Sequence, residues 1–293
     1  MPQIKKIDIH VHTRNGEGIG RIGTGHPFAS PEQLRAMYQE LGIGKGVILP
    51  ALNPECAGRI QSNEEAALLV DQYADLFYWF CNIDPRMGDN NPTSDLSHFL
   101  RYYKEMGARG VGEITANLYF DDPLVENLFA HCAKNQLPVL FHIGPQIGNC
   151  YGLVDEPGLH RLEKELAKFP ELKFIGHSQP FWAEIGTNPT DGQGYPTGKV
   201  TPGRVVDLMR RYPNLCGDLS AMSGYNALSR DSAFGWRFIE EFQDRLYFGT
   251  DICTAGEYAK TSFWLDDAVQ QGKISEVAYR KVCRDNALQI LEA

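Results

Sequence analysis

The sequence predicts an α/β protein, a (β/α)8 barrel of the TIM type that forms a single domain over residues 1–293. Three observations support this prediction. Eight short runs rich in Val, Ile, Phe and Tyr recur along the chain, longer amphipathic segments separate them, and no composition break marks a linker. A doubly wound open sheet is the competing interpretation, but the count of eight runs and the absence of a glycine-rich phosphate turn favour the barrel.

The eight runs are typical of strands that a parallel sheet buries on both faces, because several of them are almost entirely apolar. In chain order they span residues 5–12, 44–51, 76–84, 108–115, 137–144, 172–178, 214–221 and 245–251.

The segments between these runs carry helix signals. Residues 30–42, "SPEQLRAMYQELG", begin with Ser30 as an N-cap, continue with Pro31 at the first helical position and end at Gly42. The same pattern predicts helices over 62–75, 93–107, 122–136, 156–169, 201–212 and 231–243, with the last helix in 261–272 or 274–291.

Two connections are long, at residues 13–29 after the first strand and 179–200 after the sixth. In a barrel both would lie at the mouth formed by the carboxyl ends of the strands, where active sites are found. Long loops without secondary structure in a compact domain are usually functional or disordered.

The composition excludes some classes of function. A formal net charge of −9 argues against non-specific binding of nucleic acid. The N-terminus lacks the apolar run of a signal peptide, and no stretch of 18 apolar residues predicts a membrane span. Seven cysteines at wide spacings, without a CxxC pair, fit reduced thiols in a cytoplasmic protein.

The first strand carries an unusual pair of histidines, His10 and His12, in "IDIHVH". Alternation along a regular strand would put Ile7, Ile9 and Val11 on one face, against the surrounding helices. Asp8 and both histidines would then point into the barrel, with His12 nearest the mouth. Two such imidazoles can bind one metal ion. The alternative is one hydrogen-bonded core histidine and one loop histidine.

Other predicted strands bring similar groups to the same rim. They are Glu113 near the end of strand four, His142 of strand five, His177 of strand six and Asp251 of strand eight. Histidine and carboxylate ligands suit zinc, and carboxylates also suit manganese. The sequence therefore predicts a divalent metal site at the mouth. Zinc is the expected metal, with manganese or iron as alternatives, as one or two ions.

This ordered set resembles the amidohydrolase superfamily, and in particular its amidohydrolase-related (amidohydrolase 2) branch of metal-dependent TIM-barrel hydrolases. The segments that carry the resemblance are "IDIHVHT", "FHIG", "FIGHSQPFW", "YFGTDI" and "CRDNALQIL", together with "SNEEAALLVDQYADLFYWFCNIDP" after the second strand. The resemblance covers essentially the whole chain. The ligand order is specific to the superfamily, but it says little about the substrate.

The resemblance implies a role for each residue. His10, His12 and Asp251 would hold the more buried metal, and Asp251 would also accept the proton of the attacking water. His142 would complete that site or bind a second metal, and His177 would bind the second metal or polarise the substrate. Glu113, in "GVGEIT", would bridge two metals, as the corresponding residue does in TatD-type members.

The remaining candidates are weaker. His26 lies in the first long loop beside Pro27 and Phe28, where it could contact a substrate, or pack without doing so. Phe181 and Trp182 follow His177 and would either line the pocket or pack the second long loop. Cys253 is expected to be inert, since no paired histidine stands beside it. Solvated helix positions are expected for His98, His131 and His160.

The expected function is a metal-dependent hydrolase that cleaves an amide, lactone or ester bond of a small molecule. The runner-up is a decarboxylase of unsaturated or aromatic acids, of the aminocarboxymuconate-semialdehyde or resorcylate type. Glu113 as a ligand would favour hydrolysis, whereas a basic residue such as Arg14 in the pocket would fit either a decarboxylase or a lactonase. A TatD-type nuclease and a non-catalytic metal-binding barrel are less favoured. We expect no nucleic-acid or membrane partner, and the oligomeric state stays open between a monomer and a homodimer or higher homo-oligomer.

Overall fold

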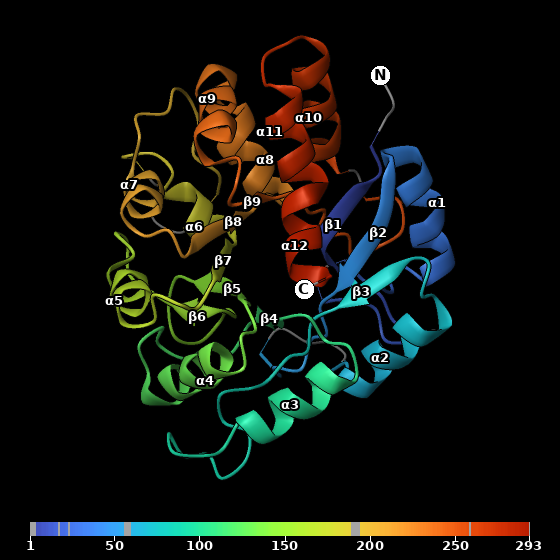
Figure 1. Ribbon diagram of the computed structural model, residues 1–293, viewed down its shortest axis with the longest axis vertical. Helices are drawn as coiled ribbons and strands as arrows, with labels where there is room; N and C mark the ends of the chain where they lie inside the picture. Colours follow the sequence, from blue (N-terminus) through green and yellow to red (C-terminus); the bar gives the residue numbers. More distant parts are fainter. Residues whose placement is uncertain are drawn as a thin grey trace.

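The computed structural model describes residues 4–16, 18–22, 24–55, 60–188, 194–257 and 259–292. In these ranges the chain forms a barrel of parallel strands surrounded by helices (Figure 1). The barrel strands are β1 (Lys6–Val11), β2 (Ile43–Ile48), β3 (Phe77–Trp79), β4 (Val111–Ile114), β5 (Val139–Gly144), β7 (Phe174–His177), β8 (Leu215–Asp218) and β9 (Leu246–Tyr247). A short additional strand, β6 (Leu153–Val154), pairs with β5. The predicted barrel is confirmed, and each predicted run overlaps one of its strands, with β2 beginning one residue before its run.

The barrel closes through single bridges between two longer ladders. The ladder β1-β2-β3 meets β4 where Cys81 bridges Val111, and β9 meets β1 where Val11 bridges Ile252. The last seam is reinforced by the Asp251 amide, which donates to the carbonyl of His10 at 2.8 Å. The first and last strands are therefore neighbours, so their chemical groups meet at one end of the barrel.

The first helix shows why local signals predicted the helices well. In α1 (Pro31–Leu41) the Ser30 side chain accepts from the Gln33 amide, the Gln33 side chain accepts from the Ser30 amide, and Gly42 ends the helix at a φ of 69°. The other predicted helices are α2 (Asn63–Gln72), α3 (Ser97–Glu105), α4 (Pro123–Lys134), α5 (His160–Lys168), α7 (Arg204–Arg211) and α9 (Ser232–Phe242). The chain ends with α10 (Lys260–Gln270), α11 (Glu276–Arg280), a π-helical turn at Lys281–Asp285 and α12 (Asn286–Leu291).

Two helices were not predicted, α6 (Gln179–Ala183) and α8 (Ala221–Ser229). The first occupies the start of the second long loop and packs against β7 and β8. Glycine makes this possible, because a Cβ on Gly176 would overlap the Phe181 ring and one on Gly217 would lie 2.7 Å from Trp182. The large rings of α6 therefore fill space that the neighbouring strands leave open.

The orientation expected for the first strand is only partly correct. Ile7 and Ile9 belong to an apolar cluster shared by strands around the whole barrel and by Ile290 of α12, so they face the interior. Asp8 points outward, where it accepts from the Tyr38 hydroxyl of α1 at 2.7 Å. The β1–β2 register is irregular between Asp8 and Val11. Such an irregularity changes which side of the sheet the next residues face.

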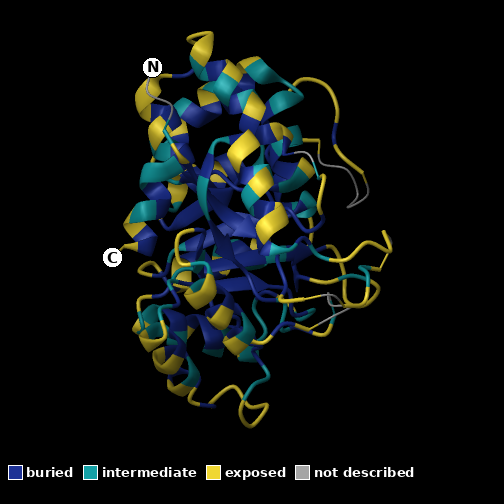
Figure 2. Ribbon diagram, turned by 90° about the vertical axis from the view of Figure 1, so that its right-hand side faces the viewer, coloured by how far each residue is buried: buried dark blue, intermediate teal, exposed yellow. Residues whose placement is uncertain are grey.

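The core has two layers. The interior cluster contains Ile9, Val47, Leu140, Ile175 and Tyr247, and a larger cluster lies between the strands and the outer helices. Figure 2 shows the buried strands at the centre of the molecule, with exposed loops projecting from one side. None of the described helices combines the length and apolar character that a membrane span requires. The six described cysteines are free thiols, and Cys56 lies outside the described residues.

Candidate metal centre

The two β1 histidines, His10 within the strand and His12 directly after it, face each other at the mouth of the barrel. The Nε2 atoms of His10 and His12 are 3.1 Å apart. His12 Nδ1 lies 2.9 Å from the carbonyl oxygen of Leu49, and His10 Nδ1 lies 2.7 Å from a carboxylate oxygen of Asp218. Because these oxygens only accept hydrogen bonds, both protons are on Nδ1 in the neutral rings. The lone pairs of both Nε2 atoms therefore point at the same place.

Two carboxylates complete this group. Asp251 Oδ1 lies 3.5 Å from His10 Nε2 and 3.4 Å from His12 Nε2. Glu113 Oε2 lies 3.6 Å from each of these nitrogens. Four ligands held at about 2.0–2.2 Å around one tetrahedral ion are separated by about 3.3–3.6 Å. The donor set therefore fits a divalent metal ion, and without a cation the four buried acceptors would repel one another.

A second group of donors lies beside the first. Glu113 Oε1 is 2.7 Å from His142 Nδ1 and 3.8 Å from His177 Nε2. Asp251 Oδ2 is also 3.8 Å from His177 Nε2. Each carboxylate thus directs one oxygen to the β1 histidines and the other to His177, with His142 also facing Glu113. This is the arrangement that a carboxylate bridging two metal positions requires.

The local electrostatics favour charged forms despite the burial. Burial disfavours the charged imidazole of His10, but the surrounding carboxylates, foremost Asp251 and Glu113, raise its pKa well above the ordinary value. Burial likewise disfavours the Glu113 carboxylate, but His10 and His12 lower its pKa well below the ordinary value. The centre therefore holds carboxylates that stay ionised and need positive charge beside them.

The backbone conformation also fixes the direction of the Asp251 side chain. Asp251 follows β9 with a φ of 56°, in the left-handed region that non-glycine residues rarely adopt. Its amide is held by the carbonyl of His10, and its side chain is 25% exposed, so one edge of the carboxylate faces the pocket. Asp8 is not a ligand, but it holds the residue that precedes Asp251. Its carboxylate accepts hydrogen bonds from the Tyr38 and Thr250 hydroxyls, and burial raises its pKa to about 6.

Two further residues of the centre were missed from the sequence. Asp218 ends β8 and contacts both His10 and His177, and Ser220 Oγ lies 3.0 Å from His177 Nδ1. Asp218 stands in "NLCGDLSA", three residues before the end of the predicted seventh strand. The strand itself ends at Asp218, so the predicted end lay too far along the chain and the strand-end signal that identified Asp251 did not mark this residue.

A pocket opens beside the ligands. Its lining includes His12, Glu113, His142 and Asp251, together with Arg14, Arg21, Phe28, Pro50, Ala51, Thr115, Tyr151 and Cys253. The Arg14 guanidinium carbon lies 4.1 Å from the centre of the Phe28 ring, and that of Arg21 lies 5.6 Å from it. Two cationic groups thus lie against one aromatic ring in the lining of the pocket.

The other candidates take different positions. His26 is exposed and is not among the described residues that line this pocket. Trp182 is 2% exposed, contacts Phe238 in the core and donates from Nε1 to the main-chain oxygen of Asp218 at 2.8 Å. The structure therefore supports a packing role for Trp182 and gives no support for a contact with the substrate. Cys253 is buried, and burial raises the pKa of its thiol well above the ordinary value.

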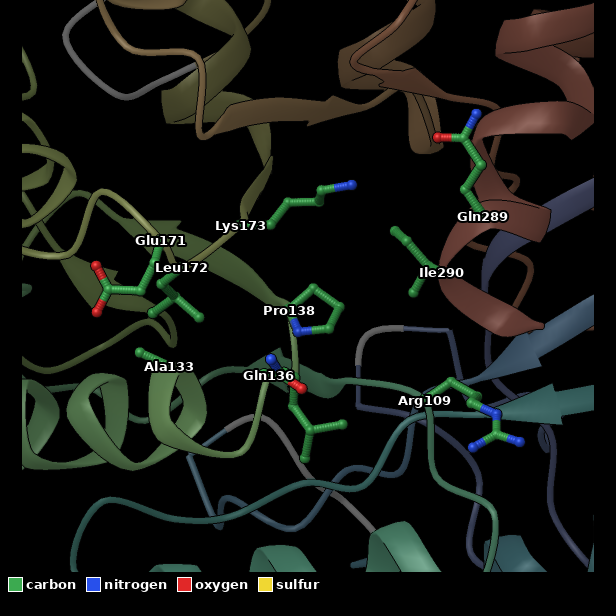
Figure 3. Close-up of a pocket in the computed structure, with 10 residues that line it drawn as sticks. Arg109, Ala133, Gln136, Pro138, Glu171, Leu172, Lys173, Gln289 and Ile290 are labelled. Atoms are coloured by element: carbon green, nitrogen blue, oxygen red, sulfur yellow. The ribbon is translucent and has the colours of Figure 1, made fainter. Parts of the chain in front are cut away.

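A larger cavity of about 410 Å³ lies at the opposite end of the barrel (Figure 3). Its lining includes Arg109, Pro138 and Lys173, which precede or begin strands, and Gln289 and Ile290 of α12. In the described part of the chain, every cluster with metal-ligand geometry lies at the mouth instead. Cavity size does not identify the site, because catalytic groups of such barrels lie at the carboxyl ends of the strands.

The two long loops are only partly described. Residues 17 and 23 of the first and 189–193 of the second lie outside the described residues. The first loop nevertheless supplies Arg14, Arg21 and Phe28 to the pocket. Tyr195 and Met222 line an adjoining pocket of about 350 Å³ that shares Asp251 and Cys253 with the first. The predicted location of both loops at the mouth is consistent with these contacts.

Comparisons with known proteins agree with the barrel fold. The family model described as amidohydrolase matches residues 7–292. An uncharacterised TIM-barrel protein from Bordetella bronchiseptica superposes with a TM-score of 0.67 at 18% identity, over 99% of each chain. A probable 2-pyrone-4,6-dicarboxylic acid hydrolase from Acinetobacter baumannii, with citric acid bound, gives 0.62 at 13% identity, over 99% of this chain and 100% of that one.

A dihydroxybenzoic acid decarboxylase from Polaromonas sp., with bound manganese and an inhibitor, gives a TM-score of 0.60 at 17% identity, over 99% of this chain and 97% of that one. At these identities the structural likenesses show the fold alone. No functionally curated protein matches the sequence.

Proposed function

We propose that this chain, which belongs to the amidohydrolase family, is a metal-dependent hydrolase that cleaves a C–O or C–N bond of a small molecule. The observation that carries the proposal is the position of Glu113. One of its oxygens faces the β1 histidines and the other faces His142 and His177. A bridging carboxylate of this kind favours hydrolysis, because it suits a centre that activates water between two ions.

His10, His12 and Asp251 would hold one ion, His142 and His177 would hold the other, and Glu113 would contact both. When bound, a divalent metal of this kind lowers the pKa of coordinated water from 15.7 to roughly 7 and polarises the scissile carbonyl. Imidazole and carboxylate ligands in this number support zinc, with manganese and iron as alternatives.

The side chains of Asp251 and His177 would have different roles in the reaction. Asp251 is partly exposed to the pocket and reaches both donor groups, so its carboxylate can accept a proton from the attacking water and return it to the leaving group. His177 is fixed through Nδ1 by Asp218 and Ser220, which keeps Nε2 directed at the centre. In the neutral ring that nitrogen carries a lone pair and can bind metal, whereas a contact with the carbonyl oxygen of the substrate would require a proton on Nε2.

The pocket supports a small anionic substrate. Arg14 and Arg21 lie on the same wall as Phe28, within a protein whose formal net charge is −9. A guanidinium binds a carboxylate by two parallel hydrogen bonds, and Phe28 would pack against an unsaturated ring or chain. A lactone or ester that carries a carboxylate fits this wall best. The acidic net charge supports a small-molecule partner rather than a nucleic acid.

A decarboxylase is the second candidate, and the same two arginines favour it. They would hold a substrate carboxylate, and one of the structures that share this fold is a decarboxylase with bound manganese. The two candidates differ in their products. Hydrolysis of a lactone releases a proton and no CO₂, whereas decarboxylation releases CO₂.

The first experiment measures metal per chain by mass spectrometry on protein purified without chelator, followed by a substrate panel. The panel contains carboxylated lactones and esters, read by proton release, amides, read by release of the amine, and hydroxybenzoates, read by CO₂ release. We expect about two metals per chain and proton release with a lactone or ester. CO₂ release without hydrolysis would favour the second candidate, and protein that binds no added zinc or manganese would refute both.

A further inference from the structure

We propose that Asp218 is a positioning residue that sets the tautomers of His10 and His177 together and thereby couples the two groups of metal ligands. The inference rests on the metal centre proposed above and extends it to a residue outside the ligand set. Asp218 Oδ2 lies 2.7 Å from His10 Nδ1 and 3.1 Å from His177 Nδ1. One oxygen atom therefore serves two histidines that belong to different ligand groups.

The position of this carboxylate is fixed from several directions. Its Oδ1 accepts from the Ser220 amide at 2.9 Å, and its Oδ2 also accepts from the Ser220 hydroxyl at 2.8 Å. The main-chain oxygen of Asp218 accepts from Trp182 Nε1. In the segment after β9, a Cβ on Gly249 would lie 2.6 Å from Oδ1, so the backbone packs directly against the carboxylate. The side chain is 0% exposed.

The chemical consequence follows from what a carboxylate can do. An ionised carboxylate only accepts hydrogen bonds, so a neutral imidazole that faces it must carry its proton on Nδ1. Nε2 is then left with a lone pair. For His10 that lone pair faces His12, and for His177 it faces Glu113 and Asp251. Both rings are thus prepared to ligate by the same buried group.

The variant Asp218→Asn separates this role from simple packing. The amide keeps the shape of the carboxylate but offers one oxygen and one NH₂ group, and the NH₂ group only donates. The Ser220 amide donates to Oδ1, so the amide oxygen of the variant takes that place and its NH₂ group takes the place of Oδ2, which faces both imidazoles. Both rings must then accept through Nδ1, so both protons move to Nε2 and point at the metal positions.

The test measures zinc binding and tautomers rather than activity. Competition with a chromophoric chelator gives the zinc affinity, mass spectrometry gives the stoichiometry, and ¹⁵N NMR of the zinc-loaded protein shows which nitrogen of each imidazole carries the proton. Variants His10→Gln and His177→Gln assign the signals. For Asp218→Asn we expect zinc binding weaker by about 10–100-fold, fewer zinc ions per chain, and an Nε2 proton on both rings.

The matched control is Ser220→Ala, which removes a hydrogen bond from the same cluster but keeps the carboxylate. It should keep the zinc stoichiometry and both Nδ1 protons. Wild-type affinity and tautomers in Asp218→Asn would overturn the proposal, as would an equal loss in Ser220→Ala.

Two further outcomes are informative. If wild-type protein binds no zinc, the proposed function fails, but the tautomers of the neutral rings can still be read in metal-free protein at alkaline pH. Nδ1 protons on both rings would then support positioning by Asp218, and an Nε2 proton on either would refute it. If Asp218→Asn does not fold, the wild-type and Ser220→Ala spectra decide the question in the same way.

Discussion

At the scale of single residues, the centre depends on which atoms of each side chain are already engaged elsewhere. His12 uses Nδ1 for the Leu49 carbonyl, so only Nε2 remains to face the pocket. Glu113 and Asp251 each present two oxygens to different partners. The same ligand residues with other hydrogen bonds would not converge, and this is why their identity alone does not specify a metal site.

The proposed proton transfer predicts the effect of Asp251→Asn. The amide can occupy the same space but cannot accept and return a proton, and it is a weaker metal ligand. We expect turnover to fall by at least about 10³-fold, with a far-ultraviolet circular dichroism spectrum close to that of the wild type. His12→Ala should abolish turnover as well. His26→Ala, an exposed change in the same region, is the control and should keep activity; full activity in Asp251→Asn would contradict the mechanism.

A buried carboxylate far from the centre gives a prediction about stability. Both oxygens of Glu165 in α5 are buried without a cationic or amide donor among the described residues, and the Glu126 carboxylate lies beside them. Burial, with Glu126 nearby, raises the pKa of Glu165 to about 7. Because the folded pKa lies above the unfolded value, the folded protein binds the extra proton. Stability should therefore fall as the pH rises from about 4.5 to about 7.

Glu165→Gln removes the charge and should stabilise the protein above pH 7 by roughly 2 kcal/mol, with little effect near pH 4.5. Denaturant unfolding at pH 5 and pH 8 checks this. Glu40→Gln, an exposed change in α1, should show no such difference between the two pH values. If Glu165→Gln fails to reduce the pH dependence, the carboxylate has a partner or contact with water in solution.

At the scale of elements, local signals explain what could be predicted. Helix α1 was predicted within a residue at each end, because Ser30, Pro31 and Gly42 define its ends through contacts within a few residues. Helix α6 was missed because it is one turn long and has no periodicity to detect. The outward orientation expected of Ile7 and Ile9 was wrong because period-two alternation assumes a regular ladder, and β1 is irregular after Asp8.

The start of β1 is held by a charged residue, which gives an element-scale prediction. Lys6 is 1% exposed, and its Nζ donates to the Leu41 carbonyl, to Ser262 Oγ and to Asp266 Oδ2, at 2.9, 2.9 and 2.7 Å. It joins the end of α1 to α10. Lys6→Met should cost about 3 kcal/mol of unfolding free energy, because it leaves buried acceptors and a partly buried carboxylate without their donor.

Lys5→Met is the matched control, since Lys5 is the exposed neighbour on the same segment. It should change stability by less than about 0.5 kcal/mol. Urea unfolding of both variants, followed by tryptophan fluorescence, makes the comparison. Equal stability of Lys6→Met and the wild type would show that the three hydrogen bonds only offset the cost of burying the ammonium group.

At the scale of the whole molecule, the barrel itself made most of the ligand positions predictable. Parallel strands end at one mouth, so a histidine or carboxylate at the end of each strand can be assigned to one site without coordinates. Asp218 shows the limit of this reasoning. It is 208 residues from His10, and its role is visible only once β8 and β1 are placed in space. Likewise, only three-dimensional packing shows that Trp182 is enclosed while Arg14 reaches the pocket.

The closed barrel also links metal binding to global stability, which gives a final prediction. The ligands come from β1, β4, β5, β7 and the segment after β9, so an ion at the mouth would join strands around the entire barrel. A ligand present at 1,000 times its dissociation constant stabilises the folded state by about 4 kcal/mol. Removal of metal by a chelator should therefore lower the melting temperature by roughly 10 °C, and added zinc should restore it.

Calorimetry of native, chelator-treated and zinc-reconstituted protein measures this shift. His12→Ala provides the control, because it lacks one of the two converging imidazoles and should respond much less to chelator and to zinc. The buried acceptors give the reason for the direction: without a cation, His10 and His12 face two carboxylates that only protons can neutralise. A melting temperature unchanged by complete metal removal would mean that protons neutralise the centre as well as a metal does, and the ion would then have no structural role.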